Sequence, residues 1–238
     1  MTPLSRIRVG TSGYSYSWNE GKPTPFQWYL AQGFDTVEIN ASFYRFPVAG
    51  WVKTWLNAPR GFDFAIKVHR SITHYSRLRP SAVELWKRFH VALQRMEGRI
   101  AFWLFQMPGN FTPSPRNVEA VRSFFDRVDL GSKAVLEFRD PSWWKERRLC
   151  EEARAVFCSV DAPSLPREII AVNDAVYVRL HGRTEWYSYI YSEKELRALL
   201  KKVASCDVER RYIYLNNDHG MIPNGRRLME LASEILCR

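Results

Sequence analysis

The sequence predicts an α/β protein, a single-domain (β/α)8 TIM barrel. Two observations predict it. Segments with the pattern of strands alternate with segments of helical periodicity, eight strands in all, and the chain has 238 residues, close to the roughly 250 that such barrels use. We find no linker, no low-complexity segment and no strong repeat beyond this alternation, so residues 1–238 are expected to form one domain. A doubly wound open sheet is the alternative.

The expected strands are short runs rich in Val, Ile, Leu and Phe, which favour a pleated and buried surface. They cover residues 7–10, 34–40, 62–69, 100–107, 134–139, 155–161, 175–181 and 212–218. One face of each strand carries Val, Ile, Leu or Phe, which suit packing under the helices.

The expected helices are set by capping signals and by an apolar stripe. Thr24 before Pro25 opens the first helix, and Gly33 closes it. The later helices cover 49–57, 81–97, 115–128, a segment capped by Ser142, 192–204 and 224–237, with capping boxes at Ser81 with Glu84 and at Ser192 with Glu195. Residues 163–170 are broken by prolines and predict only a weak sixth helix.

Polar residues gather near the C-terminal end of every expected strand. Successive strand residues face opposite sides, so residues of equal parity share a face. An upper layer would hold Ser12, Asn40, His69, Gln106, Arg139, Asp161, His181 and Asn216, and a lower charged layer would hold Glu38, Lys67, Glu137 and Arg179. Barrel enzymes place their sites at these strand ends, so we expect the functional site there.

The lower layer can be interpreted in two ways. Two acids and two bases balance, so they can form a buried ion network, with Glu38 paired to Lys67. The network can also serve a ligand, because layers of Val, Ile and Leu would fill a barrel at lower cost. We favour the second interpretation.

The balance of charges favours an anionic partner. The chain carries 35 Lys and Arg against 25 Asp and Glu, a net charge of +10. A solvated basic surface is the plain interpretation, because the basic residues are scattered along the chain. The other interpretation is that the positive charge binds a phosphorylated ligand or a nucleic acid.

Several motifs together resemble one family. They are Gly10-Thr-Ser-Gly13, Val37-Glu-Ile-Asn-Ala-Ser-Phe-Tyr44, Phe64-Ala-Ile-Lys-Val-His69, Ile72-Thr-His74, Phe105-Gln-Met-Pro108, Val135-Leu-Glu-Phe-Arg-Asp-Pro-Ser-Trp143, Val178-Arg-Leu-His-Gly182 and Leu215-Asn-Asn-Asp218. In this order they are similar to the YecE-like family, a domain of unknown function also called family 72. The resemblance covers residues 7 to 235 and implies a TIM barrel. It implies no established reaction.

We expect a barrel that binds a small phosphorylated or carboxylated ligand, with hydrolase, lyase or isomerase chemistry as the candidates. Glu38 or Glu137 would act as general base, and Lys67 or His69 as acid or electrostatic partner. The expected substrate-binding residues are Ser12, Asn40, Tyr44, His74, Gln106, Arg139, Asp161, Arg179, His181, Asn216, Asn217 and Asp218. Gly182-Arg183 and His219-Gly220 follow the last two strands, where barrels commonly bind phosphate.

Two alternatives stay open. A metal-dependent phosphoesterase or isomerase could use the carboxylates and histidines at the strand ends. The interleaved Lys67, Arg139 and Arg179 oppose a divalent cation, so no cofactor is expected. A nucleic-acid-binding protein without catalysis could stack bases on aromatic residues such as Trp143 and Tyr187.

Neither a long apolar run nor an N-terminal apolar segment is visible, so we expect no membrane span, no signal peptide and a cytoplasmic protein. The cysteines are Cys150, Cys158, Cys206 and Cys237, and none forms a C-x-x-C pair. Reduced and mostly buried thiols are therefore expected.

Overall fold

The computed structural model describes residues 6–236, and in this range eight parallel strands alternate with helices. The strands are β1 (Ile7–Thr11), β2 (Thr36–Ile39), β3 (Asp63–Lys67), β4 (Ile100–Gln106), β5 (Ala134–Glu137), β6 (Val156–Asp161), β7 (Ala175–Leu180) and β8 (Arg210–Leu215). They belong to one sheet in the order β1-β8-β7-β6-β5-β4-β3-β2. The fold class is the (β/α)8 TIM barrel, as predicted.

The helices are α1 (Pro25–Ala31), α2 (Ala41–Tyr44), α3 (Ala49–Leu56), α4 (Pro80–Leu93), α5 (Pro115–Arg127), α6 (Arg148–Glu152), α7 (Glu193–Ala204) and α8 (Met221–Leu236). The short helix α2 follows β2 after a single residue, Asn40. Residues 162–174, between β6 and β7, contain no helix, in agreement with the weak pattern of that segment.

Contacts group the chain into two compact units. We call residues 39–157 the central unit, and the described residues before and after it the terminal unit. One domain spanning residues 1–238 stays a prediction.

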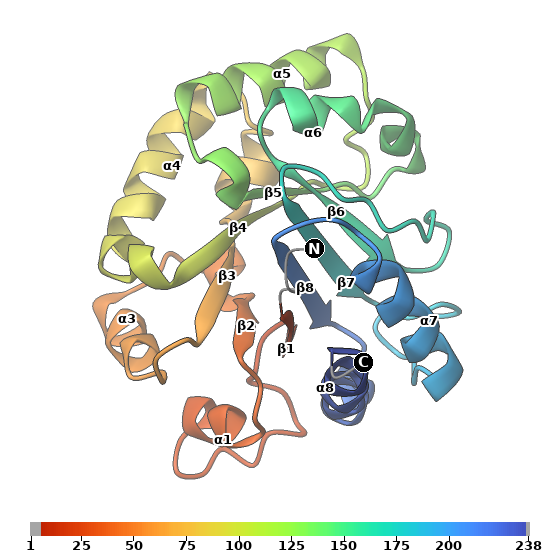
Figure 1. Ribbon diagram of the computed structural model, residues 1–238. Helices are drawn as coiled ribbons and strands as arrows, with labels where there is room; N and C mark the ends of the chain where they lie inside the picture. The colour runs from red at the N-terminus through yellow and green to blue at the C-terminus, as the bar shows by residue number, and fades with distance from the viewer. Residues whose placement is uncertain (1–5, 237–238) are drawn as a thin grey trace. The chain divides into compact units, whose positions relative to one another are not determined.

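In the terminal unit, β8 pairs with both β1 and β7, and β7 pairs with β6 from Cys158 onward. Helix α8 packs on β1 and on α7 (Figure 1). A Cβ atom on Gly10 would lie 2.3 Å from the carbonyl oxygen of Thr36. Only glycine therefore lets β1 approach the start of β2 this closely.

In the central unit, β4 pairs with β3 and β5, and β5 continues the ladder to Val156 and Phe157. Helices α4 and α5 pack against each other and appear in yellow and green in Figure 1. Aromatic side chains dominate the core beneath them, namely Trp86, Phe89, Trp103 and Phe105.

Two of the predicted helix starts are confirmed in detail. The Thr24 hydroxyl caps α1 by accepting from the backbone N–H of Gln27. Ser192 and Glu195 form the reciprocal capping box of α7, and α7 buries Leu196, Leu199, Leu200 and Val203 as predicted.

Three boundary predictions are wrong. Helix α4 begins at Pro80, so Ser81 already has helical backbone and cannot act as its N-cap. The cap near residue 142 is Asp140, whose carboxylate accepts from the backbone N–H of Ser142. Helix α8 begins at Met221, because the turn Asp218–Gly220 leads directly into it.

No helix within the described range is both long and apolar enough to cross a membrane. Cys150 and Cys158 are free and buried, and Cys206 is free and half-buried. Burial raises the pKa of the Cys150 thiol, which keeps this group protonated and inert. Cys237 lies outside the described residues.

Candidate functional site

The predicted site residues divide evenly between the two units. The terminal unit holds Ser12, Glu38, Asp161, Arg179, His181, Asn216, Asn217 and Asp218, and the central unit holds Asn40, Tyr44, Lys67, His69, His74, Gln106, Glu137 and Arg139. The lower charged layer is buried throughout, whereas several upper-layer residues are partly exposed. This gradient agrees with the two layers inferred from strand parity.

In the terminal unit, Glu38 is the centre of a buried polar cluster. Arg179 Nη2 lies 2.7 Å from Glu38 Oε1, and the Tyr177 hydroxyl donates to Glu38 Oε2 at 2.6 Å. Arg179 also donates to the Ser12 hydroxyl at 3.3 Å. All four side chains are fully buried. Burial first, and then the Glu38 charge, raise the pKa of Tyr177, so its hydroxyl stays a proton donor.

The predicted ion network is thus confirmed for Glu38 and Arg179. The pairing of Glu38 with Lys67 stays a prediction. Tyr177 is a residue that sequence reasoning missed, although it has the parity of Arg179 and His181 on the same strand and could have been found from that pattern.

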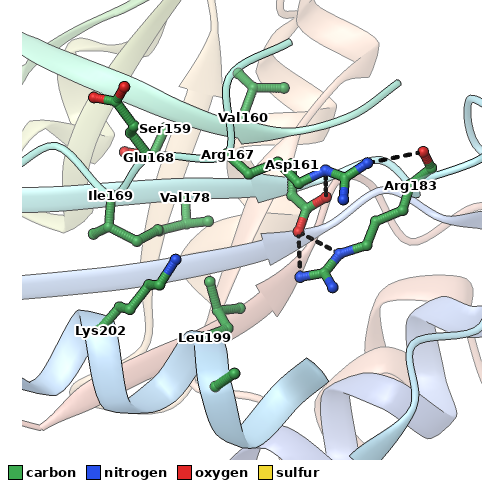
Figure 2. Close-up of a pocket in the computed structure, with 11 residues that line it drawn as sticks. Ser159, Val160, Asp161, Arg167, Glu168, Ile169, Val178, Arg183, Leu199 and Lys202 are labelled. Carbon is green, nitrogen blue, oxygen red and sulfur yellow. Dashed lines mark hydrogen bonds and ion pairs between the residues drawn. The ribbon is translucent and has the colours of Figure 1, made fainter. Parts of the chain in front are cut away.

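A second network in the terminal unit surrounds Asp161 at the end of β6. Arg183 donates to Asp161 Oδ2 at 3.0 Å, and Arg167 Nε lies 3.7 Å from Asp161 Oδ1 (Figure 2). Arg183 also donates to Glu195 Oε1 at 2.8 Å. Burial raises the pKa of Asp161, and the Arg183 hydrogen bond opposes that rise. Arg183, in the predicted phosphate loop, therefore already has two carboxylate partners.

This network borders a cavity of about 250 Å³ under the helix-free connection between β6 and β7. Its apolar wall includes Val160, Val178 and Leu199 (Figure 2). In a regular barrel, a helix between β6 and β7 would cover the strands at this place.

The other predicted residues of the terminal unit have mainly structural contacts. His181 packs on Trp186 and Tyr187. Asn217 donates to the Tyr189 carbonyl at 2.7 Å and to Asn224 at 3.0 Å. Asn216 and Asp218 are partly exposed. Ligand binding by these four residues stays a prediction.

In the central unit, His74 lies among positive charges. It belongs to a π-helical turn, Ser71–Tyr75, that follows β3. Its ring packs edge-on against Phe43 at 4.9 Å, and the ammonium of Lys67 lies 4.3 Å from the centre of the same Phe43 ring. Burial first, and then the charges of Lys67, Arg77, Arg139 and Arg70, lower the pKa of His74 to about 4. His74 is therefore neutral near neutral pH.

The backbone around His74 is unusual. The N–H of Ser76 bonds to the carbonyl of Ser71 at 2.9 Å, which is the spacing of a π-helix. The next two residues, Arg77 and Leu78, have φ values of 49° and 58°. Such left-handed geometry in non-glycine residues is costly and is frequent at functional sites.

The remaining predicted residues of the central unit lie at the C-terminal ends of β2, β3, β4 and β5 or in the segments that follow these strands. The His69 ring nitrogen Nδ1 lies 2.8 Å from the Ser71 hydroxyl, and burial lowers its pKa. Arg139 and Glu137 form an ion pair at 2.5 Å. Asn40 precedes α2 and Tyr44 ends it, while Gln106 donates to the carbonyl of the next residue at 2.8 Å. Their roles as site residues stay predictions.

Sequence reasoning missed Arg70, Arg77 and Tyr75. Arg70 and Arg77 flank the family motif Ile72-Thr-His74, so their closeness to this motif in the sequence could have pointed to them. Residues 70–77 carried no strand or helix pattern, so nothing fixed the direction of their side chains. Among the described residues, no group of three or more His, Cys, Asp or Glu is placed to hold a metal ion.

The lowered pKa of His74 gives a pH prediction. An unfolded histidine has a pKa of about 6.5, and the folded His74 has a pKa of about 4. Between these values the unfolded chain binds more protons, so the free energy of unfolding should fall as pH falls through this window. His69 contributes in the same direction.

Urea unfolding followed across this pH range checks the effect. His74→Gln should flatten the pH dependence relative to the wild type. An equal slope in the wild type and in His74→Gln would contradict the assignment.

Comparison with known proteins identifies the family. Residues 8–234 match the family described as "Protein of unknown function DUF72". A crystal structure of a DUF72 family protein from Thermotoga maritima is 28% identical, with a TM-score of 0.83, over 96% of this chain and 99% of that chain. No curated protein matches this chain.

Two structures of a DUF72 family protein from Enterococcus faecalis agree in fold. One is 20% identical with a TM-score of 0.81, covering 96% of this chain and 95% of that chain. The other is 19% identical with a TM-score of 0.75, covering 99% of each chain. The match over residues 8–234 confirms the resemblance seen in the motifs, and the chain belongs to the DUF72 family of proteins of unknown function.

Proposed function

We propose that the protein binds a small anionic ligand, phosphorylated or carboxylated, at the C-terminal strand ends of the central unit. One observation carries the proposal: four cationic side chains surround His74. They come from the end of β3, from the segment between β3 and α4, and from the residues after β5, and they are Lys67, Arg70, Arg77 and Arg139.

The partners of two of these cations are neutral. Arg77 donates to the side-chain oxygen of Asn110 at 2.8 Å, and Arg70 lies beside the rings of Tyr44 and Tyr75. Because these partners carry no charge, they do not neutralise the guanidinium. The guanidinium can donate two parallel hydrogen bonds to phosphate or carboxylate.

The terminal unit offers a contrast. Its buried Arg179 is paired with Glu38, and Arg183 is shared by Asp161 and Glu195. Carboxylates already balance these guanidinium groups, so an anion would have to displace an existing partner. In the central unit Arg139 is likewise paired with Glu137, but the partners given above for Arg70 and Arg77 are neutral. These two guanidinium groups favour the central unit as the place where a ligand anion binds.

The same residues support acid–base chemistry. His74 Nδ1 lies 2.9 Å from the Thr73 hydroxyl, which orients the ring. A bound anion would offset the surrounding cations and raise the His74 pKa towards the operating pH, where a general acid or base works best. Hydrolase, lyase and isomerase reactions are the classes that this arrangement suits.

Inorganic phosphate tests the proposal directly. We expect phosphate to raise the His74 pKa by about one unit or more, because an anion within roughly 4–6 Å favours the charged imidazolium. A pH titration of the histidine ring protons by NMR measures the shift, with His74→Gln to assign the signal. His90, which bonds to Glu97 on a different part of the central unit, serves as an internal reference.

A matched pair of variants completes the test. Arg77→Asn removes a charge near His74 while keeping a residue that tolerates left-handed backbone, and it should weaken phosphate binding. Arg88→Gln removes one charge from the exposed face of α4 and should not. No phosphate-dependent change at His74, or equal loss in both variants, would overturn the proposal.

A further inference from the structure

Two tyrosines near the cationic cluster are strongly exposed. Tyr44, at the end of α2, has 63% of its surface exposed, and Tyr75, at the end of the π-helical turn, has 69%. A single exposed ring is ordinary on a protein surface, whereas exposed rings gathered at one place call for an explanation.

Both rings contact the same guanidinium. The Arg70 Cζ atom lies 5.9 Å from the centre of the Tyr44 ring and 5.8 Å from the centre of the Tyr75 ring. Cation–π attraction at these distances holds the three side chains together. We call Tyr44, Arg70 and Tyr75 the aromatic platform.

The aromatic platform is supported from within and adjoins His74. Tyr44 packs edge-on against Phe43 at 5.0 Å, and Phe43 in turn packs edge-on against His74 at 4.9 Å. Tyr75 follows His74 directly in the chain, and Arg70 is one of the cations that act on His74. The exposed rings therefore adjoin residues that belong to the cationic cluster or contact His74.

We propose that the ligand carries a planar aromatic ring next to its anionic group, and that the ring stacks on the aromatic platform while Lys67 and Arg77 bind the anion. This inference rests on the proposed function and names its ligand class. A nucleoside monophosphate has this chemistry, and so do simple aryl phosphates.

The flat side chains of the aromatic platform favour a ligand that carries an aromatic ring. Tyrosine rings and a guanidinium plane are flat, polarizable surfaces that stack on aromatic rings and gain little from a flexible aliphatic chain. The rings are already oriented by Phe43 and Arg70, so stacking orders few additional side-chain torsions. An anion alone would be served by the cations without two exposed tyrosines.

Two pairs of probes separate the contribution of the aromatic ring to binding from that of the phosphate. Phenyl phosphate and ethyl phosphate share the anion and differ in the ring, and adenosine monophosphate and ribose 5-phosphate differ in the base. By calorimetry, we expect the ring-bearing member of each pair to bind at least about fivefold more tightly, the lower end of the effect of stacking one base on an aromatic side chain.

Variants of the two tyrosines test whether the aromatic platform causes the preference for ring-bearing probes. Tyr44→Leu and Tyr75→Leu should each reduce the preference for the ring-bearing probe and leave ethyl phosphate binding unchanged. Trp28→Leu is the matched control, because Trp28 is a partly exposed ring on α1 and belongs to the terminal unit. Circular dichroism verifies that each variant is folded.

The outcomes separate this inference from the proposed function. Equal binding of both members of each pair overturns the platform and leaves anion binding standing. Binding of no phosphate probe overturns both. Tighter binding of a single-stranded oligonucleotide than of adenosine monophosphate, lost in both tyrosine variants, supports the same ring-and-phosphate chemistry and identifies a nucleic-acid strand as its source.

Discussion

Replacing Glu38 by alanine should lower the free energy of unfolding by about 3–5 kcal/mol, the usual cost of removing one member of a buried ion pair. Glu38 and Arg179 are both fully buried, with 2.7 Å between Oε1 and Nη2. Without the carboxylate, the Arg179 guanidinium keeps the cost of burial and loses its charged partner. Tyr177 also loses the acceptor for its hydroxyl. Urea unfolding measures the effect.

Three comparisons make this measurement specific. Tyr177→Phe removes one hydrogen bond to a charged group and should cost about 1.5–3 kcal/mol. Glu193→Ala, in the exposed ion pairs with Arg197 and Arg227, should cost much less than Glu38→Ala, because solvent screens these charges. A double replacement of Glu38 and Arg179 by methionine should be milder than Glu38→Ala, since it leaves no buried charge. A Glu38→Ala loss as small as that of Glu193→Ala would refute the argument.

Replacing Gly182 by alanine should also be strongly destabilising, by about 3 kcal/mol or more, because strain and steric overlap act together. Gly182 has a φ of 110°, a conformation that alanine rarely adopts. A Cβ atom there would lie 2.4 Å from the carbonyl oxygen of Glu185 and 2.7 Å from the Cβ of Tyr189. The loop that presents Arg183 to Asp161 would have to move.

Gly50→Ala is the matched control. Gly50 lies within α3, and no atom is within 4 Å of a Cβ built on it. Alanine there should stabilise the protein by about 0.5–1 kcal/mol, since it favours helix more than glycine does. Thermal unfolding separates the two, and a Gly182→Ala variant as stable as the wild type would show that the loop adapts without strain.

The fold could be predicted from sequence because its signals are local. Alternation within strands, Thr24 before Pro25, and the Ser192–Glu195 box depend on neighbouring residues alone, and each appears in the structure where expected. Strand parity also predicted which polar residues would be buried, since a strand offers only two faces. The cap errors at Ser81 and Ser142 both arise from a nearby residue. Pro80 begins α4 and makes Arg79 its N-cap, and Asp140 supplies the cap expected of Ser142.

The candidate site could be predicted only in part, because partner choice depends on distances across the fold. Parity placed Glu38 and Arg179 in one layer but could not choose Arg179 as the partner of Glu38. The cations around His74 include Arg70 and Arg77, which come from a π-helical turn and a left-handed pair of residues. Neither geometry has a periodicity that sequence reasoning can detect.

The pair of Glu38 and Arg179 also bears on how the chain is synthesised. The two residues are separated by 141 positions. At translation rates of about 5–20 residues per second, Glu38 leaves the ribosome roughly 7–28 seconds before its partner. During that interval the whole central unit is made, and Glu38 stays hydrated at the end of an unfinished strand. A charge that is costly to bury alone thus receives its partner only after the central unit has been made, so nascent chains stalled before Arg179 should keep Glu38 in contact with solvent.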